Sequence, residues 1–247
     1  MRKNKRFLVL AAMLLAVACA ATFMVGSAVA ADEDVASITV KIGDAEAQTA
    51  DSFAAAMELV KAADADAVKV ITLGEGVVDA VDANTFRIET PNLTIAGAGA
   101  DKTTIKFDKT MRGSGVEYFG GRIAYPTIYA TADVTIEGLT IAGPTDEHHG
   151  IDGILAKAAL TVKDVVITDI RCTADGGEIC GVQYGRPILV DGEGDVSLVN
   201  VEIKKFQKQA IDLNTTGDIT IRSVTITGAG EQAIIAQNGI ILRKGNA

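Results

Sequence analysis

Tryptophan is absent from this 247-residue sequence, which also contains only two histidines and three cysteines. The absence of tryptophan weakens the case for a site that stacks aromatic rings on a sugar. Two of the cysteines, Cys172 and Cys180, close a short segment that offers too few further ligands for zinc. In an oxidising compartment we expect them to form a disulfide, and we predict no metal site.

Basic residues are also scarce, with 23 Lys and Arg against 32 Asp and Glu. Four of the bases lie in the first 31 residues, which hold no acid, so the remainder has 19 bases, 32 acids and a net charge of −13. A surface this acidic repels phosphate backbones, which argues against a nucleic-acid partner. We predict no cofactor; Ca²⁺ recruited by carboxylates is the alternative, although no motif supports it.

The N-terminus has the three parts of a secretory signal peptide. Met1–Arg6 is basic, Phe7–Val25 is apolar, and Ala28–Ala30 forms a small-x-small cleavage site. We therefore expect an exported bacterial protein that is extracellular or held at the cell surface. Two alternatives stay open, in which Cys19 is lipidated or the apolar stretch is retained as a membrane anchor. The sequence predicts no other contact with a membrane.

From about residue 93 onward, one sequence pattern recurs. Each copy has two apolar–polar–apolar strands separated by a two-residue polar corner, and the copies are Asp133–Ile141, Ala159–Ile167, Asp195–Ile203 and Asp218–Ile226. One copy cannot bury its apolar face alone, so the copies must stack as in a solenoid. Because the unit contains only strands, we predict an all-β fold, a parallel β-helix. Its hand should be right, since parallel crossovers almost always take that hand.

Only one segment has a clear helical pattern. Asp51–Ala63 places Phe53, Met57 and Val60 on one face, and each of its first two residues can act as the N-cap. An amphipathic α-helix at this point would cap the open strand edges at the end of a solenoid. The expected organisation is a signal peptide, an N-terminal strand with a capping helix, and a β-helix, over residues 1–31, 32–67 and 68–247.

The start of the repeat region resembles a known superfamily. The helix is followed by Val70–Gly76 (VITLGEG), Pro91–Gly99 (PNLTIAGAG) and Thr103–Ile105. This order is similar to the opening of the pectate-lyase-like right-handed parallel β-helix superfamily, over about residues 50–247. The resemblance implies three parallel sheets and three turn regions per coil. It implies no activity, because that superfamily includes lyases, hydrolases, adhesins and inert surface proteins.

Within that layout, each coil also has a first strand, at residues 127–129, 151–153, 188–190, 211–213 and 234–236. We expect their inward side chains to form one buried ladder, made of Ile128, Ile151, Ile188, Ile211 and Ile234. Their neighbours would point outward, and these are Tyr129, Asp152, Leu189, Asp212 and Ile235. The long third turns would project from one side of the stack, at residues 108–126, 144–150 and 171–187.

These turns and the adjoining strand gather residues that are typical of a sugar or uronate site. They hold all four tyrosines, four arginines and both histidines. Aromatic rings stack on pyranoses, and arginines fork onto carboxylates. The alternative is a small aromatic cluster that lets the long turns fold back. The residues expected to contact a ligand are Arg122, Tyr125, Tyr129, Asp152, Tyr184 and Arg186, with Tyr118 as a further ring.

Three residues are candidates for catalysis. Asp152 and Asp212 would lie two coils apart, with backbones about 10 Å apart, near the carboxyl spacing of an inverting glycosidase. His149 offers a general base or a metal ligand. The alternative is that all three are solvated polar side chains. The signatures of superfamily members that cleave polygalacturonate (Asn-Thr-Asp, Asp-Asp, Gly-His-Gly and Arg-Ile-Lys) do not occur in register, nor does the aspartate run of Ca²⁺-dependent lyases.

We therefore expect a secreted or cell-surface β-helix without catalysis, an adhesin-like scaffold that contacts extracellular polysaccharide or cell-surface glycans. The alternative is a polysaccharide lyase or glycoside hydrolase that acts on a uronate-containing polysaccharide. A further alternative is that the chain is one part of a longer β-helix.

Overall fold

The computed structural model describes residues 36–80, 86–107, 115–145, 150–172, 183–228 and 235–244. The chain divides into two compact units, Met1–Asp32 and Glu33–Ala247, and all described residues lie in the second. The expected signal peptide therefore lies outside the described residues. The second unit is mostly β, as predicted, and its described part contains one α-helix.

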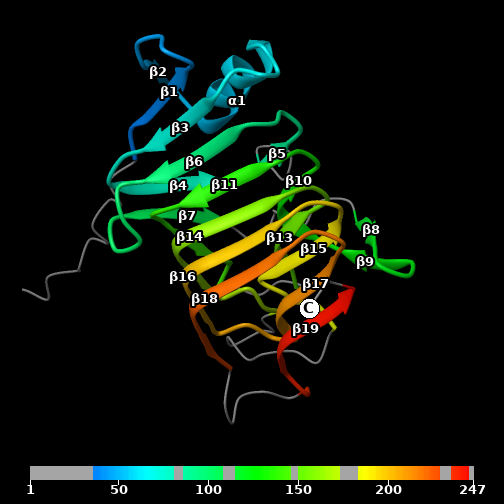
Figure 1. Ribbon diagram of the computed structural model, residues 1–247. Helices are drawn as coiled ribbons and strands as arrows, with labels where there is room; N and C mark the ends of the chain where they lie inside the picture. The colour runs from blue at the N-terminus through cyan, green and yellow to red at the C-terminus, as the bar shows by residue number, and fades with distance from the viewer. Residues whose placement is uncertain are drawn as a thin grey trace, which may run out of the picture. The chain divides into compact units, whose positions relative to one another are not determined.

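Parallel strands make up most of the first sheet, where they follow one another in chain order (Figure 1). They are β3 (Lys69–Leu73), β6 (Leu93–Gly97), β11 (Val134–Glu137), β14 (Leu160–Thr168), β16 (Val196–Lys204) and β18 (Ile219–Thr227). The same sheet contains a second row of parallel strands, β4 (Gly76–Ala80), β7 (Thr103–Phe107) and β12 (Thr140–Ala142). They pair with one another in this order, and β12 pairs with the second half of β14. The four repeats pair in parallel with matching positions aligned, so their expected pairing is confirmed.

Each long strand of this sheet bends at one residue with positive φ. Asp164, Asn200 and Ser223 have φ of 55°, 54° and 55°, and Gly138 has φ of 64° at the matching place between β11 and β12. Short polar residues and glycine tolerate this left-handed conformation better than others do. The polar corner of the repeat is thus a bend that separates two arms, and both arms bury alternate side chains.

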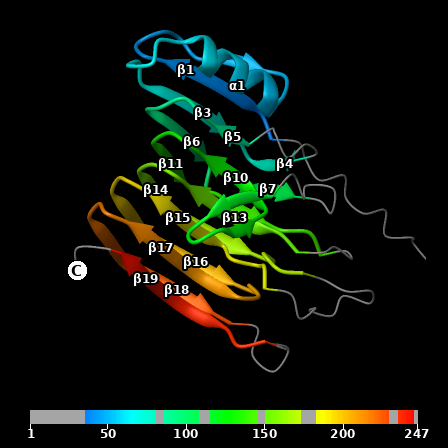
Figure 2. The same ribbon diagram turned by 90° about the vertical axis from the view of Figure 1, so that its right-hand side faces the viewer.

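A second sheet consists of six parallel strands (Figure 2). In sheet order its strands are β5 (Arg87–Ile88), β10 (Pro126–Ala130), β13 (Asp152–Ala156), β15 (Ile188–Gly192), β17 (Gln209–Thr215) and β19 (Asn238–Lys244). From β10 onward, the connections from this sheet to the first are three residues long, at 131–133, 157–159, 193–195 and 216–218, whereas β5 is joined to β6 by four residues. The buried side chains of the two sheets belong to one apolar core.

The isoleucine ladder of the second sheet differs from the expected one in two places. Register pairing gives Ile128, Ile154, Ile188, Ile211 and Ile240. Ile154 thus stands where Ile151 was expected. Ile234 lies outside the described residues, and Ile240 continues the ladder in its place. At each of these two places, Ile151 against Ile154 and Ile234 against Ile240, two similar apolar segments follow each other closely in the sequence. The alternation of apolar and polar residues alone is compatible with either segment as the strand.

Residues near the N-terminus form a different structure. β1 (Ile38–Ile42) pairs in antiparallel fashion with β2 (Gln48–Ala50) and with β3. Helix α1 (Phe53–Ala62) begins after Ser52, whose hydroxyl accepts a hydrogen bond from the backbone N–H of Ala55 at 3.1 Å. The buried face of α1 packs on β1 and β2, and the Phe53 ring stacks on Phe86 with centroids 4.1 Å apart.

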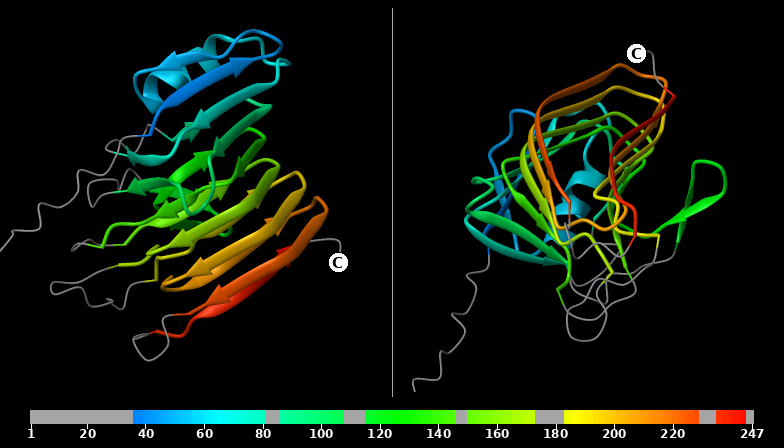
Figure 3. Two further views of the ribbon diagram at one scale, coloured as in Figure 1. Left: turned by 90° about the vertical axis from the view of Figure 1, so that its left-hand side faces the viewer. Right: turned by 90° about the horizontal axis from the view of Figure 1, so that it is seen from below.

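An antiparallel hairpin covers part of the outer face of the second sheet (Figures 1 and 3). It consists of β8 (Val116–Tyr118) and β9 (Arg122–Ala124) and lies within the expected turn 108–126. Tyr118 and Ala124 pack on Leu155 and Leu189, and all four are buried. The outer positions of this sheet, which were expected to face solvent, are therefore partly enclosed.

Candidate functional site

Asp152 is fully buried and forms a double hydrogen-bonded ion pair with Arg186. Arg186 donates from Nε to Oδ1 at 2.7 Å and from Nη2 to Oδ2 at 2.6 Å. The backbone N–H groups of Arg186 and Tyr125 also donate to this carboxylate, at 3.1 and 2.9 Å. The interpretation of Asp152 as a solvated outward side chain is wrong, because the turn that carries Arg186 folds over it.

The remaining donors of Arg186 hold the hairpin. Nη1 bonds to the Tyr118 hydroxyl, and Nη2 donates to the carbonyl of Ile123 at 3.1 Å. Burial opposes the charge of Arg186, but its hydrogen bonds to Asp152 outweigh that effect and raise its pKa. Burial also raises the pKa of Tyr118, against the influence of Arg186. Every guanidinium nitrogen of Arg186 thus has a partner within the protein.

A second set of polar contacts holds the other side of the hairpin. Lys157 donates to Asp191 at 2.5 Å and to the carbonyl of Glu117 at 3.1 Å. The backbone N–H of Phe119 donates to Asp191 at 3.1 Å, and the side chain of Asn214 donates to it at 2.6 Å. Partial burial works against ionisation of Asp191, yet these hydrogen bonds lower its pKa.

Asp212 is also buried, and its partner is Arg243 on β19. Arg243 donates from Nε and Nη2 to the two carboxylate oxygens, at 2.5 and 2.6 Å. The hydrogen bonds to Asp212 raise the pKa of Arg243. Asp212 is the register partner of Leu189 and Ile241, whereas Asp152 is the partner of Pro126. The two aspartates therefore do not occupy matching positions two coils apart, and the spacing expected for a glycosidase is wrong.

A groove of about 700 Å³ lies between the hairpin and the last strands of the second sheet. We call it the arginine groove; its lining residues are Tyr118, Arg122, Ile123, Gln183, Tyr184, Arg186, Lys208, Gln209, Ile241 and Arg243. Four of these ten side chains are cationic, and none of these described lining residues is acidic. The surface of the groove is thus lined by cations on a chain with a net charge of −9, and two of them, Arg186 and Arg243, are paired with the buried Asp152 and Asp212 behind it.

Aromatic rings alternate with the guanidinium groups around the groove. The Cζ atom of Arg186 lies 4.8 Å from the ring centroid of Tyr118 and 5.7 Å from that of Tyr184. Phe119 stands between two further arginines, with Arg243 at 4.8 Å and Arg122 at 5.8 Å. Cation–π contacts of this kind help to keep the guanidinium planes in place.

The structure brings together some of the residues expected to bind a ligand. Arg122, Tyr184 and Arg186 line the arginine groove. Tyr125 makes an edge contact with Tyr184, with centroids 5.0 Å apart, and Tyr129 lies 5.1 Å from Arg87 in a cation–π contact. Neither of these last two tyrosines, nor the buried Asp152, is among the residues that line the groove.

Other predicted residues lie partly outside the described chain. His149 and Cys180 are not among the described residues, and Cys172 is buried. The disulfide therefore stays a prediction. In the segments that the structure describes, no group of three or more His, Cys, Asp or Glu side chains could hold a metal ion.

Two cations of the groove, Lys208 and Arg243, were not predicted from the sequence. Lys208 lies in a short connection, and its ammonium donates to the carbonyl of Ala236 at 3.2 Å. Arg243 lies where the register between β17 and β19 shifts, after the pair of Leu213 and Leu242. Such a β-bulge redirects a side chain. The alternating apolar pattern of β19 does not reveal the bulge, so no sequence signal pointed to Arg243.

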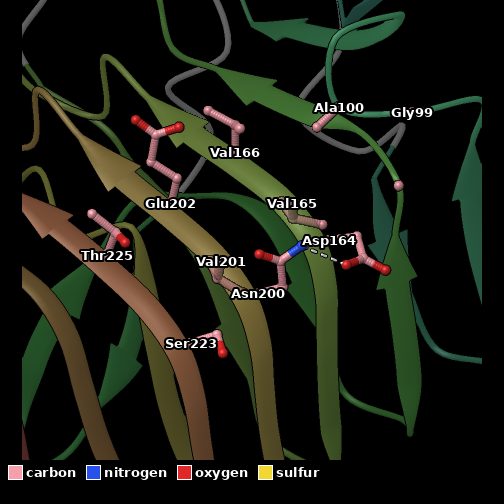
Figure 4. Close-up of a pocket in the computed structure, with 11 residues that line it drawn as sticks. Gly99, Ala100, Asp164, Val165, Val166, Asn200, Val201, Glu202, Ser223 and Thr225 are labelled. Carbon is pink, nitrogen blue, oxygen red and sulfur yellow. Dashed lines mark hydrogen bonds between the residues drawn. The ribbon is translucent and has the colours of Figure 1, made fainter.

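A second hollow, of about 450 Å³, runs along the bends of the first sheet. Figure 4 shows Asp164, Asn200 and Ser223 on successive strands, with Glu202 and Thr225 beside them. Asn200 donates to Asp164 at 2.7 Å. Because this hollow carries two carboxylates and no cation among its lining residues, its charge is opposite to that of the arginine groove.

Among the described residues, no helix has both the length and the apolar character needed to cross a membrane. Comparison of the chain with protein-family models, with curated proteins and with solved structures finds no match.

Proposed function

We propose that this protein is an exported, right-handed parallel β-helix that binds an extracellular glycan in the arginine groove without cleaving it. The in-register parallel pairing of the repeats supports the β-helix, and the right hand follows from the general preference of parallel crossovers. In this proposal α1 caps the N-terminal end of the β-helix. The basic, apolar and small-residue segments of residues 1–30 support export.

One observation carries the binding function: four cations, two tyrosines and two amide side chains line the groove, without a lining carboxylate. Arg186 and Arg243 are held by the buried Asp152 and Asp212, so Arg122 and Lys208, for which the described residues show no ion pair, are the cations that would contact a ligand. The ring of Tyr184 offers a flat apolar face for a sugar, whereas Tyr118 is buried, and amide and guanidinium groups bond to hydroxyls and anions. A groove of about 700 Å³ is in the size range of ligand sites. Its positive charge favours a glycan that carries acidic groups.

The state of the two aspartates argues against hydrolysis. A glycosidase needs one carboxyl group that holds a proton and a second that contacts the sugar or a water molecule. Asp152 and Asp212 are at most 2% exposed, and each is held in a two-point ion pair with an arginine. Neither carboxylate can reach a substrate without breaking its pair. A polysaccharide lyase or hydrolase remains the alternative that the experiment below distinguishes.

The test is a binding and cleavage assay on the full-length protein. Galacturonate, sulfated galactan and neutral galactan oligosaccharides of equal length are titrated calorimetrically, with and without Ca²⁺, and the mixtures are then analysed for products. We expect binding of at least one oligosaccharide and no cleavage. New reducing ends, or the ultraviolet absorbance of an unsaturated product, would establish the enzymatic alternative.

Two variants locate the binding site. Tyr184→Ala removes a ring face from the groove and should weaken binding about tenfold, in line with the energies of aromatic contacts. Thr225→Ala changes an exposed residue of the hollow at the bends and should leave binding unchanged. Equal loss in both variants, or no binding of any oligosaccharide, would contradict the proposed function.

A further inference from the structure

The last strands of both sheets have a free edge. In the described part of the chain, β18 pairs only with β16, and β19 pairs only with β17 (Figure 1). Ile240 and Leu242 on β19 are 45% and 55% exposed, whereas their register partners Ile211 and Leu213 are fully buried. This end of the molecule thus presents apolar side chains framed by unpaired backbone groups, a surface that readily accepts another strand.

The sequence of β18 is nearly symmetric about its midpoint. Its core-facing residues are Ile219 and Ile221 before the midpoint and Val224 and Ile226 after it, and all four are only half-buried. Reversing the strand exchanges the first with the last and the second with the third. Two antiparallel copies of β18 would therefore place an aliphatic side chain opposite an aliphatic side chain at every core-facing position.

The outward residues of β18 have the same symmetry. Thr220 and Thr225 exchange places on reversal, and both are exposed. Arg222 exchanges with Ser223, so the only charged side chain of the strand would not lie directly opposite its own copy. Like charges directly opposite each other destabilise a strand pair, and this arrangement avoids that effect. The bend of the strand also lies at this midpoint, at Ser223. The two arms of β18 therefore exchange places on reversal, and the apolar side of each arm still faces the core.

Backbone groups before the bend are oriented for this pairing. The carbonyl of Asp218 accepts a hydrogen bond from Val196 on the preceding coil at 2.8 Å. Successive residues of a strand direct their N–H and C=O groups to alternate sides. The N–H and C=O groups of Ile219 and Ile221 therefore point toward the free edge.

The same holds after the bend. In β14 the N–H of Val166 donates to Leu139 of the preceding coil at 3.1 Å, and Thr225 occupies the equivalent position of β18. Its neighbours Val224 and Ile226 consequently direct their N–H and C=O groups to the free edge. The residues that become opposite partners on reversal are thus also the residues with free hydrogen-bonding groups.

We infer that two copies of this chain associate through β18, antiparallel about a two-fold axis, and that this dimer covers the apolar end formed by β18 and β19. A closed pair is favoured over a filament because the strands at the other end of the first sheet, β2 and β4, are three and five residues long and cannot pair along the nine residues of β18. The paired strand β18 contributes no residue to the arginine groove, so the dimer is tested separately from the proposed function, although Ile241 and Arg243 of the neighbouring β19 line that groove.

The pairing makes a specific prediction for crosslinking. Thr220 would lie opposite Thr225 of the second copy in a non-hydrogen-bonded pair, where Cα atoms are about 4.5 Å apart, a distance that a disulfide can span. The double variant Thr220→Cys/Thr225→Cys of the full chain should form disulfide-linked dimers under mild oxidation. Each single variant should not, because its cysteine would lie opposite a threonine.

Sedimentation equilibrium over micromolar concentrations tests the interface independently. We expect wild type to dimerise and Ile221→Lys to shift the association at least tenfold toward monomer, because a charge enters the apolar seam. Thr220→Lys is the matched control, one residue away on the outward face, and should remain dimeric. Circular dichroism verifies that each variant is folded.

Several outcomes would overturn the dimer. A wild-type chain that stays monomeric over the whole concentration range would do so, as would equal crosslinking of the single and double cysteine variants. If Ile221→Lys does not fold, the cysteine variants decide the question, because they leave every core-facing residue of β18 unchanged. The absence of linked dimers in the double cysteine variant would contradict the proposed register.

Discussion

Leu189 and Asp212 are register partners on the outer face of the second sheet, and neither is more than 2% exposed. The hairpin β8–β9 covers the leucine, and Arg243 neutralises the aspartate. A face that would otherwise be solvated is thus buried by two different means, one apolar and one ionic. The arginine groove lies where these two coverings meet.

The Asp152–Arg186 pair should contribute more to stability than the Asp212–Arg243 pair. Asp152→Ala leaves Arg186, whose side chain is 5% exposed, without its counter-ion, and should lower the free energy of unfolding by about 3–5 kcal/mol. Asp212→Ala should cost about 1–2 kcal/mol, because Arg243 is 14% exposed on an edge strand and can turn toward water. Urea unfolding measures both changes.

The double variant Asp152→Leu/Arg186→Met is the control for this comparison. It removes both charges together, so no unpaired ion stays buried, and much of the stability lost in Asp152→Ala should return. If the double variant is as unstable as the single one, the loss comes from packing or from the other hydrogen bonds of the two side chains, and not from the unpaired charge.

Close contact between neighbouring coils makes Gly192 hard to replace. A Cβ atom added there would lie 1.9 Å from the backbone carbonyl of Lys157, so Gly192→Ala must push two coils apart. We expect a loss of about 1–3 kcal/mol, as for other overpacked sites. Gly239→Ala is the matched control, because a Cβ there meets nothing within 4 Å. Comparable melting temperatures of the two variants would contradict this account.

The attachment of the hairpin should depend on pH through Asp191. The pKa of Asp191 is lowered from its ordinary value of 3.8, so its ionised form stabilises the folded state. This contribution is present above pH 3.8 and is lost as the pH falls through the lowered pKa. The NMR shift of the Phe119 amide, which donates to Asp191, should stay constant from pH 7 to 5 and change only in stronger acid. Asp191→Asn should abolish that acid transition; a transition unchanged in this variant would assign it to another group.

The ladder of the second sheet can be tested with one charge at two places. Ile211→Asp introduces an unpaired carboxylate at a fully buried position and should prevent folding or cost more than about 4 kcal/mol. Ile240→Asp, at the next position of the same ladder, should cost about 1 kcal/mol or less in the monomer because Ile240 is 45% exposed. If both variants lose the same free energy of unfolding in urea, Ile240 is as well covered as Ile211, contrary to this account.

Much of the fold followed from the sequence, because side-chain alternation specifies which face of a strand is buried. The paired positions Leu160, Val196 and Ile219 were recognisable for this reason. The choice between Ile151 and Ile154 was not, since β13 is buried on both faces and alternation is then uninformative. The hairpin that buries its outer face comes from a turn whose pairing has no periodic signal.

The site was predictable only in part. Clustering of arginine and tyrosine in the long turns led to Arg122, Tyr184 and Arg186, which line the arginine groove; their contact with a ligand stays a prediction. The sequence could not show that Arg186 is already saturated by Asp152, because that contact joins residues 34 positions apart through a fold-specific turn. Nor could it reveal Arg243, whose direction depends on a bulge.

The constant three-residue connections and single-residue bends have a consequence for protein engineering. Because they recur from β10 onward, the different spacings of the repeats are taken up almost entirely between the end of a first-sheet strand and the start of the next second-sheet strand. At residues 205–208 this stretch is short, while at residues 169–187 it is long, yet both coils keep the same register. Foreign peptides could therefore be grafted at this position of a coil, and the framework would display them in a row without changing its own spacing.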